Sequence, residues 1–170
     1  MRRIRVAHVI TRMCVGGAQE NTFHTVRLAN NDRYEVDLVS GRTARSEPSM
    51  ELSARDTGIE IVHVKHLVRN PSPLNDLRAY NELVRLFRER RYDIVHTHTS
   101  KAGYLGRMAA AKAGVPIVVH TPHGHIFFGY FSRLLTGFFT KLERDAAQKT
   151  DKLIELTQRG VDQHLAEGVG

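Results

Sequence analysis

Three histidines stand within six residues in the segment 118–131, which reads VVHTPHGHIFFGYF. A zinc site would use His120, His123 and His125. However, no H-E-x-x-H or Cys-pair spacing accompanies them, and no nearby carboxylate completes a ligand set, so we expect no metal here. One histidine that forms hydrogen bonds with a polyhydroxylated ligand fits this segment better. We expect His123 to take that role, with Gly124 after it allowing an unusual backbone angle.

A second polar stretch, HTHTSKAG, begins at His96. His96 and His98 are two residues apart and share one face of an extended strand. His98 lies nearer the carboxyl end of that strand, where a ligand would bind, whereas His96 is better explained as a hydrogen-bonded core histidine. Ser100 and Lys101 open the following helix and could bind an anionic or polar substrate.

A glycine pair, Gly16 and Gly17, stands in TRMCVGGAQEN, where a first strand gives way to a helix. Free backbone N–H groups and the helix dipole favour an anion at such a helix start. The alternative is that the pair only permits a tight turn. The stretch is neither G-x-G-x-x-G nor a P-loop, so it supports neither a nicotinamide dinucleotide site nor nucleoside triphosphate hydrolysis.

Four aromatic residues follow the histidine segment: Phe127, Phe128, Tyr130 and Phe131. The amphipathic segment 132–150 comes next, with basic residues interleaved among its apolar ones. This combination suits a membrane interface or contact with an apolar acceptor. The alternative is that the helix packs its apolar face against a sheet.

The composition is that of a globular protein with a basic surface. The 170 residues carry a net charge of +7, which favours an anionic partner such as a phosphate-bearing substrate or an acidic membrane surface. No nucleic-acid recognition motif is present. A single cysteine, Cys14, indicates a reducing compartment. We predict a cytoplasmic protein without a signal peptide or a transmembrane helix.

Strand and helix patterns alternate along the whole sequence. This alternation predicts β-α-β units with right-handed crossovers, and hence one Rossmann-like, three-layer α/β/α domain with a mainly parallel sheet. Ligands of such a sheet bind beyond the carboxyl ends of its strands. The expected strands are 4–10, 34–41, 59–64, 93–98, 115–121 and 151–157, and the expected helices are 18–30, 50–57, 74–90, 100–114, 132–150 and 159–167.

Several of these motifs, taken together and in order, resemble one known family. They are VAHVITRMCVGGAQENT, YEVDLVSG, DIVHTHTSKAGYLGRMAAAKAGVPIVVHTPHG and LIELTQRGVDQHL. Over nearly all 170 residues the sequence is similar to the amino-terminal, acceptor-binding domain of family-4 retaining glycosyltransferases with the GT-B architecture.

The resemblance implies a site and its substrates. Gly16 and Gly17 match the glycine pair that approaches the donor diphosphate, and His123 matches the histidine beside the transferred sugar. The donor would be a UDP- or GDP-linked sugar, used without a metal or other cofactor. The acceptor would be a lipid- or polyprenyl-linked glycan or a cell-envelope polysaccharide, reached from the inner face of the membrane.

The sequence departs from this family in three ways. Gln19 stands where an acidic residue is common, LTQRG replaces a frequent SEA, and no second domain with an E-x7-E motif follows. We therefore expect residues 1–170 to be one domain of a larger enzyme, inactive alone because half the cleft is missing, or a degenerate relative. The alternatives are a nucleotide-sugar epimerase-like domain and a non-catalytic carbohydrate- or phosphate-binding module.

Overall fold

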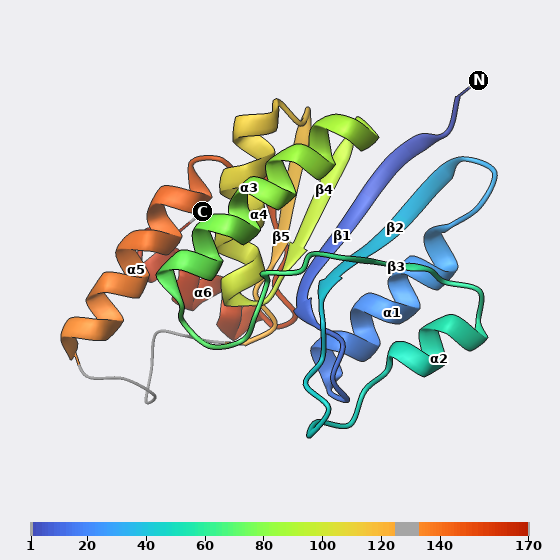
Figure 1. Ribbon diagram of the computed structural model, residues 1–170. Coiled ribbons are helices and arrows are strands. Elements are labelled where there is room, and N and C mark those ends of the chain that lie inside the picture. The colour runs from blue at the N-terminus through green and yellow to red at the C-terminus, as the bar shows by residue number, and fades with distance from the viewer. Residues whose placement is uncertain (1, 125–132, 170) are drawn as a thin grey trace.

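The computed structural model describes residues 2–124 and 133–169, in which strands and helices alternate as predicted (Figure 1). The helices end close to their predicted positions, and Gly58, with a φ of 77°, follows the end of α2 as a C-terminal capping glycine. The elements are β1 (Ile4–Arg12), α1 (Gly17–Ala29), β2 (Tyr34–Gly41), α2 (Glu51–Asp56), β3 (Ile61–His63), α3 (Pro73–Arg90), β4 (Ile94–His98), α4 (Ser100–Ala113), β5 (Ile117–Thr121), α5 (Arg133–Ala147), β6 (Lys152–Leu153) and α6 (Gln158–Ala166).

The sheet has the strand order β3-β2-β1-β4-β5-β6, and its strand pairs are parallel. The order reverses between β1 and β4, so the carboxyl ends of these two strands form the topological switch point of the domain. This arrangement confirms the single Rossmann-like domain that the sequence predicted. Figure 1 shows α1 and α2 on one side of the sheet and α3 and α4 on the other.

Alternate residues of β1 enter different cores. Val6 and Ile10 belong to the cluster that includes Phe23 of α1, whereas Ala7 and Val9 belong to the cluster that includes Phe87 of α3. The period of two in a strand thus assigns each residue to a face. His8 shares the α1 face with Val6 and Ile10.

Helix α4 lies unusually close to the sheet because it carries glycines at the contact. A Cβ atom on Gly106 would meet the Thr97 Cγ2 atom at 2.6 Å, and one on Gly103 would overlap the His120 ring. His120 therefore faces α4, on the side of the sheet opposite α1. Its ring is 1% exposed and bonds through Nδ1 to the Thr97 hydroxyl at 2.9 Å.

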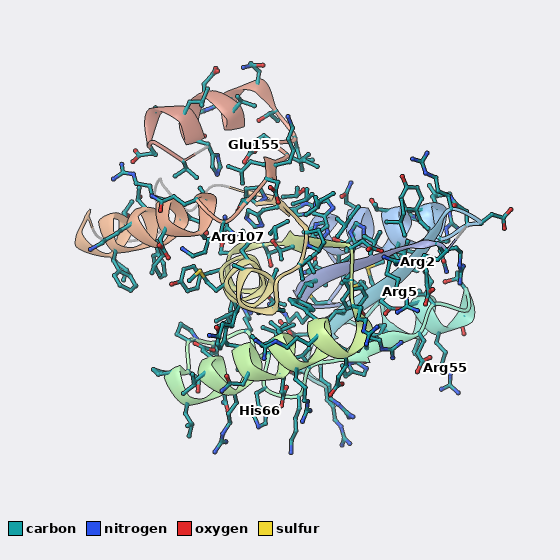
Figure 2. The ribbon with its side chains drawn as sticks, turned by 90° about the horizontal axis from the view of Figure 1, so that it is seen from above. Arg2, Arg5, Arg55, His66, Arg107 and Glu155 are labelled. Atoms are coloured by element: carbon teal, nitrogen blue, oxygen red, sulfur yellow. The ribbon has the colours of Figure 1, made fainter. Side chains whose placement is uncertain are left out.

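A buried ion pair joins α4 to α5. The Arg107 guanidinium, labelled in Figure 2, lies 2.5 Å from the Glu143 carboxylate, and its Nε donates to the Gly103 carbonyl at 2.9 Å. The Arg107 side chain is fully buried and Glu143 is nearly so. Such a pair is costly to break, because either partner alone would leave an uncompensated buried charge.

The last strand is shorter than predicted. The segment 151–157 was expected to be a strand throughout, but only Lys152–Leu153 pairs with β5. β6 is the edge of the sheet, and the chain soon turns toward α6. The Thr157 hydroxyl accepts from the Gly160 N–H as the N-cap of α6, and Glu155 lies 3.1 Å from His164.

Candidate functional site

The carboxyl ends of β1, β4 and β5 meet through threonines. The Thr11 and Thr99 hydroxyls lie 3.2 Å apart, and the Thr99 N–H donates to the Thr121 carbonyl at 3.2 Å. The Thr11 hydroxyl also accepts from the Ala102 N–H in the first turn of α4. β1 thereby caps a helix that begins about 90 residues later. The edge is therefore tied together before any ligand binds.

Two residues at this edge have a strained backbone. Thr99 and His123 both have a φ of 62°, in the left-handed region that favours glycine. Each such residue costs about 1–3 kcal/mol and persists only where surrounding contacts hold it. The two follow neighbouring strands, β4 and β5, at the switch-point edge. Strain concentrated here, next to a histidine, is typical of a functional site.

Three histidines gather on the α1 face of the sheet at the same edge. His8 of β1 pairs in register with His96 of β4, and His98 follows two residues later. The ring centroids of His96 and His98 are 4.2 Å apart, which confirms that they share a face. The His8 Nδ1 atom lies 2.9 Å from His98 Nε2, and His96 Nε2 lies 2.8 Å from the Thr121 hydroxyl.

His123 joins this cluster from the loop after β5. Its Nε2 atom lies 2.9 Å from His98 Nδ1, so the structure brings together two residues predicted independently from separate motifs. His98 is 1% exposed and His123 is half-buried. Gly124, the next residue, is exposed, and a Cβ atom there would meet nothing within 4 Å. His123 therefore connects the buried His98 to the surface.

Burial keeps these histidines neutral. Desolvation lowers the pKa of His8 to about 3 and that of His96 to about 4. It also lowers the pKa of His98 and, more mildly, of His123; neighbouring imidazoles add to the effect at His98. At neutral pH the cluster thus offers uncharged donors and acceptors, which suit sugar hydroxyls better than they suit an anion.

The zinc site considered above would use His120, His123 and His125, and the structure describes the first two of these residues. His120 faces α4 and His123 bonds to a histidine of the opposite face, while His125 lies outside the described residues. Ligand nitrogens of His8, His96 and His98 do lie within 4.8 Å of one another. However, both ring nitrogens of His98 already bond to other histidines, so a metal would have to replace at least one of these bonds.

The glycine pair lies at the start of α1. The Gly16 carbonyl accepts from the Glu20 N–H at 2.9 Å, which begins the helix, and no side chain caps it. A Cβ atom on exposed Gly17 would meet no described residue within 4 Å. The domain itself therefore does not require glycine at position 17. Open space beside free helix N–H groups is what a diphosphate would need there.

Ser100 and Lys101 open α4, as predicted, but they have different surroundings. Ser100 is exposed. The Lys101 ammonium is held by the Asp76 carboxylate at 2.6 Å and by the Val68 and Asn70 carbonyls at 2.9 and 2.5 Å. It thus fastens α4 to the loop before α3, and its binding of acceptor stays a prediction.

The predicted membrane or acceptor contacts Phe127, Phe128, Tyr130 and Phe131 lie outside the described residues. The helix that follows, α5, exposes Leu135 by 40% and Phe138 by 55%. It therefore does not bury its whole apolar side in the core. Among the helices that the structure describes, none is long and apolar enough to cross a bilayer.

A separate cavity of about 450 Å³ is lined by residues of α2, of β3 and of the turn between them. Its lining includes Glu51, Arg55 and His63 but none of the predicted site residues. It lies along the edge strand β3 and not at the switch point between β1 and β4, so the histidine cluster is the better candidate site.

Two site residues, His8 and Thr11, were not anticipated from the sequence. Both belong to β1, and the sequence predicted no role in the site for either. Their partners His98 and Thr99 are about 90 residues away. A signal was available in principle: aligning the carboxyl ends of the predicted strands 4–10 and 93–98 places His8 beside His96, as the structure does.

Comparison with known proteins identifies the family. Residues 16–170 match the glycosyl transferase 4-like domain. The chain is 34% identical over 152 residues to UDP-Gal:alpha-D-GlcNAc-diphosphoundecaprenol alpha-1,3-galactosyltransferase of Escherichia coli, an alignment that covers 89% of this chain and 38% of that protein. The chain thus spans well under half the length of this relative.

Solved structures share the fold at low identity. Sucrose-phosphate synthase of Thermosynechococcus elongatus superposes with a TM-score of 0.69 at 14% identity, over 99% of this chain and 46% of the other. The lipopolysaccharide outer core galactosyltransferase WaaB gives 0.63 at 16%, over 98% and 43%. UDP-GlcNAc 2-epimerase of Neisseria meningitidis, bound to UDP-GlcNAc, gives 0.69 at 12%, over 98% and 44%. The family match, which covers most of the sequence, decides the assignment: the chain belongs to the glycosyl transferase 4-like family.

Proposed function

We propose that this chain is the acceptor-side, amino-terminal domain of a retaining glycosyltransferase of the hexosyltransferase type. The enzyme would move a sugar from a UDP- or GDP-linked donor to a lipid- or polyprenyl-linked glycan, without a metal. A partner domain would supply the main nucleotide site. The family match and the galactosyltransferase relative support a glycosyltransferase; the finer statements are ours.

The observation that carries the proposal is the convergence of three elements at one edge. The start of α1 offers free N–H groups beside open space at Gly17. The loop after β5 carries His123, and the start of α4 carries exposed Ser100. A diphosphate at the first and a sugar beside the second would place the reacting carbon near the switch point of the sheet.

His123 suits contact with the transferred sugar because of its bonding. Its Nε2 atom is occupied by His98, which leaves Nδ1 as the nitrogen for a sugar hydroxyl. Burial lowers its pKa, so the ring is neutral at physiological pH and can serve as either donor or acceptor. The hydrogen bond to His98 orients the ring before the substrate arrives.

A membrane-bound acceptor is favoured by charge and by surface. The net charge is +7, and α5 exposes Leu135 and Phe138 on its apolar side. An anionic bilayer would attract such a surface, and exposed apolar side chains could enter its interface. We therefore place the protein in the cytoplasm, peripherally at the inner face of the membrane. The name of the Escherichia coli relative indicates a diphosphoundecaprenol-linked acceptor for that enzyme.

The decisive experiment screens UDP- and GDP-sugars with polyprenyl-diphosphate-linked acceptors, using the complete gene product. Release of free nucleoside diphosphate that requires both donor and acceptor supports the transferase. Isomerised nucleotide-sugar formed without acceptor would instead identify an epimerase. Binding without either product would leave a carbohydrate-binding module.

Within an active enzyme, His123→Ala should lower kcat/KM by about 100-fold or more, because a bond to the reacting sugar is lost. His63→Ala, which changes an exposed histidine on β3, is the matched control. Near-wild-type turnover in His123→Ala would remove His123 from the site.

A further inference from the structure

Two hydrogen bonds join His8, His98 and His123 into one chain across β1, β4 and the loop after β5. The His8 Nδ1 atom lies 2.9 Å from His98 Nε2, and His98 Nδ1 lies 2.9 Å from His123 Nε2. His98 uses both of its ring nitrogens in this chain. His8 and His98 are only 4% and 1% exposed, so bulk water does not compete for these bonds.

Neutral imidazoles in such a chain cannot choose their tautomers independently. Each neutral ring has one N–H and one acceptor nitrogen, and each bond needs one hydrogen between its two nitrogens. If His8 donates from Nδ1, then His98 must donate from Nδ1 and His123 must accept at Nε2. If His98 donates from Nε2 to His8, then His123 must donate from Nε2. Only these two arrangements keep both bonds.

We propose that His8 and His98 are positioning residues that decide whether His123 presents a donor or an acceptor to the substrate. In the first arrangement His123 carries its hydrogen on Nδ1 and donates to a sugar oxygen. In the second its Nδ1 accepts from a sugar hydroxyl. The catalytic meaning of this coupling rests on the proposed function; the coupling itself does not. His8 has no direct hydrogen bond to His123 in this chain; it sets the tautomer of His123 through His98.

The surroundings of the chain keep its members neutral. The ionisable groups that act on it are His96, whose ring centroid lies 4.2 Å from that of His98, and His120 on the opposite face. Both are themselves neutral at pH 7, because burial lowers their pKa. Within residues 2–124 and 133–169, no carboxylate is among the groups that shift the pKa of His8, His98 or His123. A ring in this chain therefore has no counter-ion that would hold it charged.

The first test uses the unaltered complete gene product, labelled with ¹⁵N only in its histidines. Ring ¹⁵N shifts at pH 7 report the tautomer of each histidine directly. We expect His8, His98 and His123 to carry their hydrogens all on Nδ1 or all on Nε2. One ring of the opposite tautomer, or a charged ring at pH 7, would overturn the proposal.

Variants at position 8 then test the direction of the effect. His8→Phe removes the end of the chain, whereas His8→Asn keeps a polar group near the place of Nδ1. We expect the ¹⁵N shifts of His123 to change in His8→Phe and to stay close to wild type in His8→Asn. His24→Phe, at an exposed position of α1, is the control. Unchanged His123 shifts in a folded His8→Phe protein would overturn the proposal.

Turnover gives a readout that a purely structural role would not produce. We expect His8→Phe to lower kcat by about 10-fold with little change in KM, as for the loss of a group that orients a ligand-bound histidine. His8→Asn should restore most of that rate. If the wild-type enzyme is active, equal rates in wild type, His8→Phe and His8→Asn would overturn the proposal.

Failure of the proposed function would look different from failure of this inference. A protein without transferase activity but with coupled tautomers would refute the function and leave the histidine chain standing. Zinc is the remaining arm of the test. Stoichiometric Zn²⁺ binding that shifts the ring nitrogens of His8, His96 and His98 would overturn the proposal, because those nitrogens would then be ligands.

Discussion

Buried histidines lie on both faces of the sheet, and they differ in what they connect to. On the α4 face, His120 bonds to the Thr97 hydroxyl and packs against Gly103. On the α1 face, His98 bonds to His8 and to His123, which reaches the surface. Both His98 and His120 are 1% exposed and both have a lowered pKa. Burial and a lowered pKa therefore do not distinguish His98 from His120. What distinguishes His98 is its hydrogen bond to the half-buried His123, and for this reason we take the α1 face as the candidate site.

If the α4 face is structural, breaking its buried ion pair should give the largest loss of stability. Arg107→Met leaves the Glu143 carboxylate buried without its partner, and we expect unfolding to become easier by about 3–5 kcal/mol. Urea denaturation followed by circular dichroism measures this. The double change Arg107→Met with Glu143→Leu should recover most of the loss. A loss under about 1 kcal/mol in the single variant would contradict a structural role for this pair.

Acid should lower the stability of the protein, because His8 and His96 on the α1 face have a lower pKa in the folded state than in the unfolded state. His8 and His96 take up protons below pH 6.5 when unfolded, but only near pH 3 and pH 4 when folded. The unfolded chain thus binds more protons between these limits. Stability is complete above pH 6.5 and falls as the pH drops toward 4, by about 3 kcal/mol for the two groups at pH 5.5.

Urea denaturation at several pH values checks this slope, and the His8→Asn variant should show a shallower one. His24→Gln, at an exposed site, should leave it unchanged. If stability is flat from pH 7 to pH 5, then the α1 face is not desolvated as described.

The close contact of α4 with the sheet predicts a smaller loss. Gly103→Ala would drive a Cβ atom into the His120 ring, and we expect a cost of about 1–3 kcal/mol. Gly137→Ala in α5 is the matched control, since a Cβ atom there meets nothing within 4 Å and alanine favours a helix. Thermal denaturation of both proteins is sufficient. Equal stability of the two would show that α4 can move away from the sheet at no cost.

The smallest expected loss of stability comes from removing one threonine hydroxyl on each face of the sheet. Thr97→Val removes a partner of His120, and Thr121→Val removes the partner of His96. Each should cost about 1 kcal/mol of stability. Only Thr121→Val should also alter the ¹⁵N shifts of the neighbouring His98, whose ring centroid lies 4.2 Å from that of His96. If Thr97→Val also changes the ¹⁵N shifts of His98, then the histidines of the two faces are not independent of each other, which contradicts this prediction.

The sequence predicted the fold almost completely, because alternating strands and helices depend on local patterns. β2 has its predicted limits, and β1 begins where expected, since apolar runs and flanking turns are visible without any partner. β6 is shorter than predicted because pairing at an edge depends on its neighbour. The polar contacts of Glu155 and Thr157 that end it are tertiary or capping features.

The site was predicted only in part, for a similar reason. His98 and His123 stand in recognisable polar segments at strand ends, and the structure brings them together. His8 stands inside an apolar strand, and its role depends on the register of β1 with β4. Lys101 was predicted to bind an anion because it is a cation at a helix start. Its ammonium instead donates hydrogen bonds to carbonyls of a loop about 30 residues earlier. Pairings of this kind are set by topology rather than by spacing.

The left-handed backbone at Thr99 has a consequence for protein engineering. Glycine at this position would relieve the steric strain, so a selection for heat resistance alone would favour it. The same change would free the hinge that joins β4 to α4, directly beside His98. A thermostability screen run without an activity assay would thus enrich variants whose site is less well ordered, and position 99 should be held fixed in any such library.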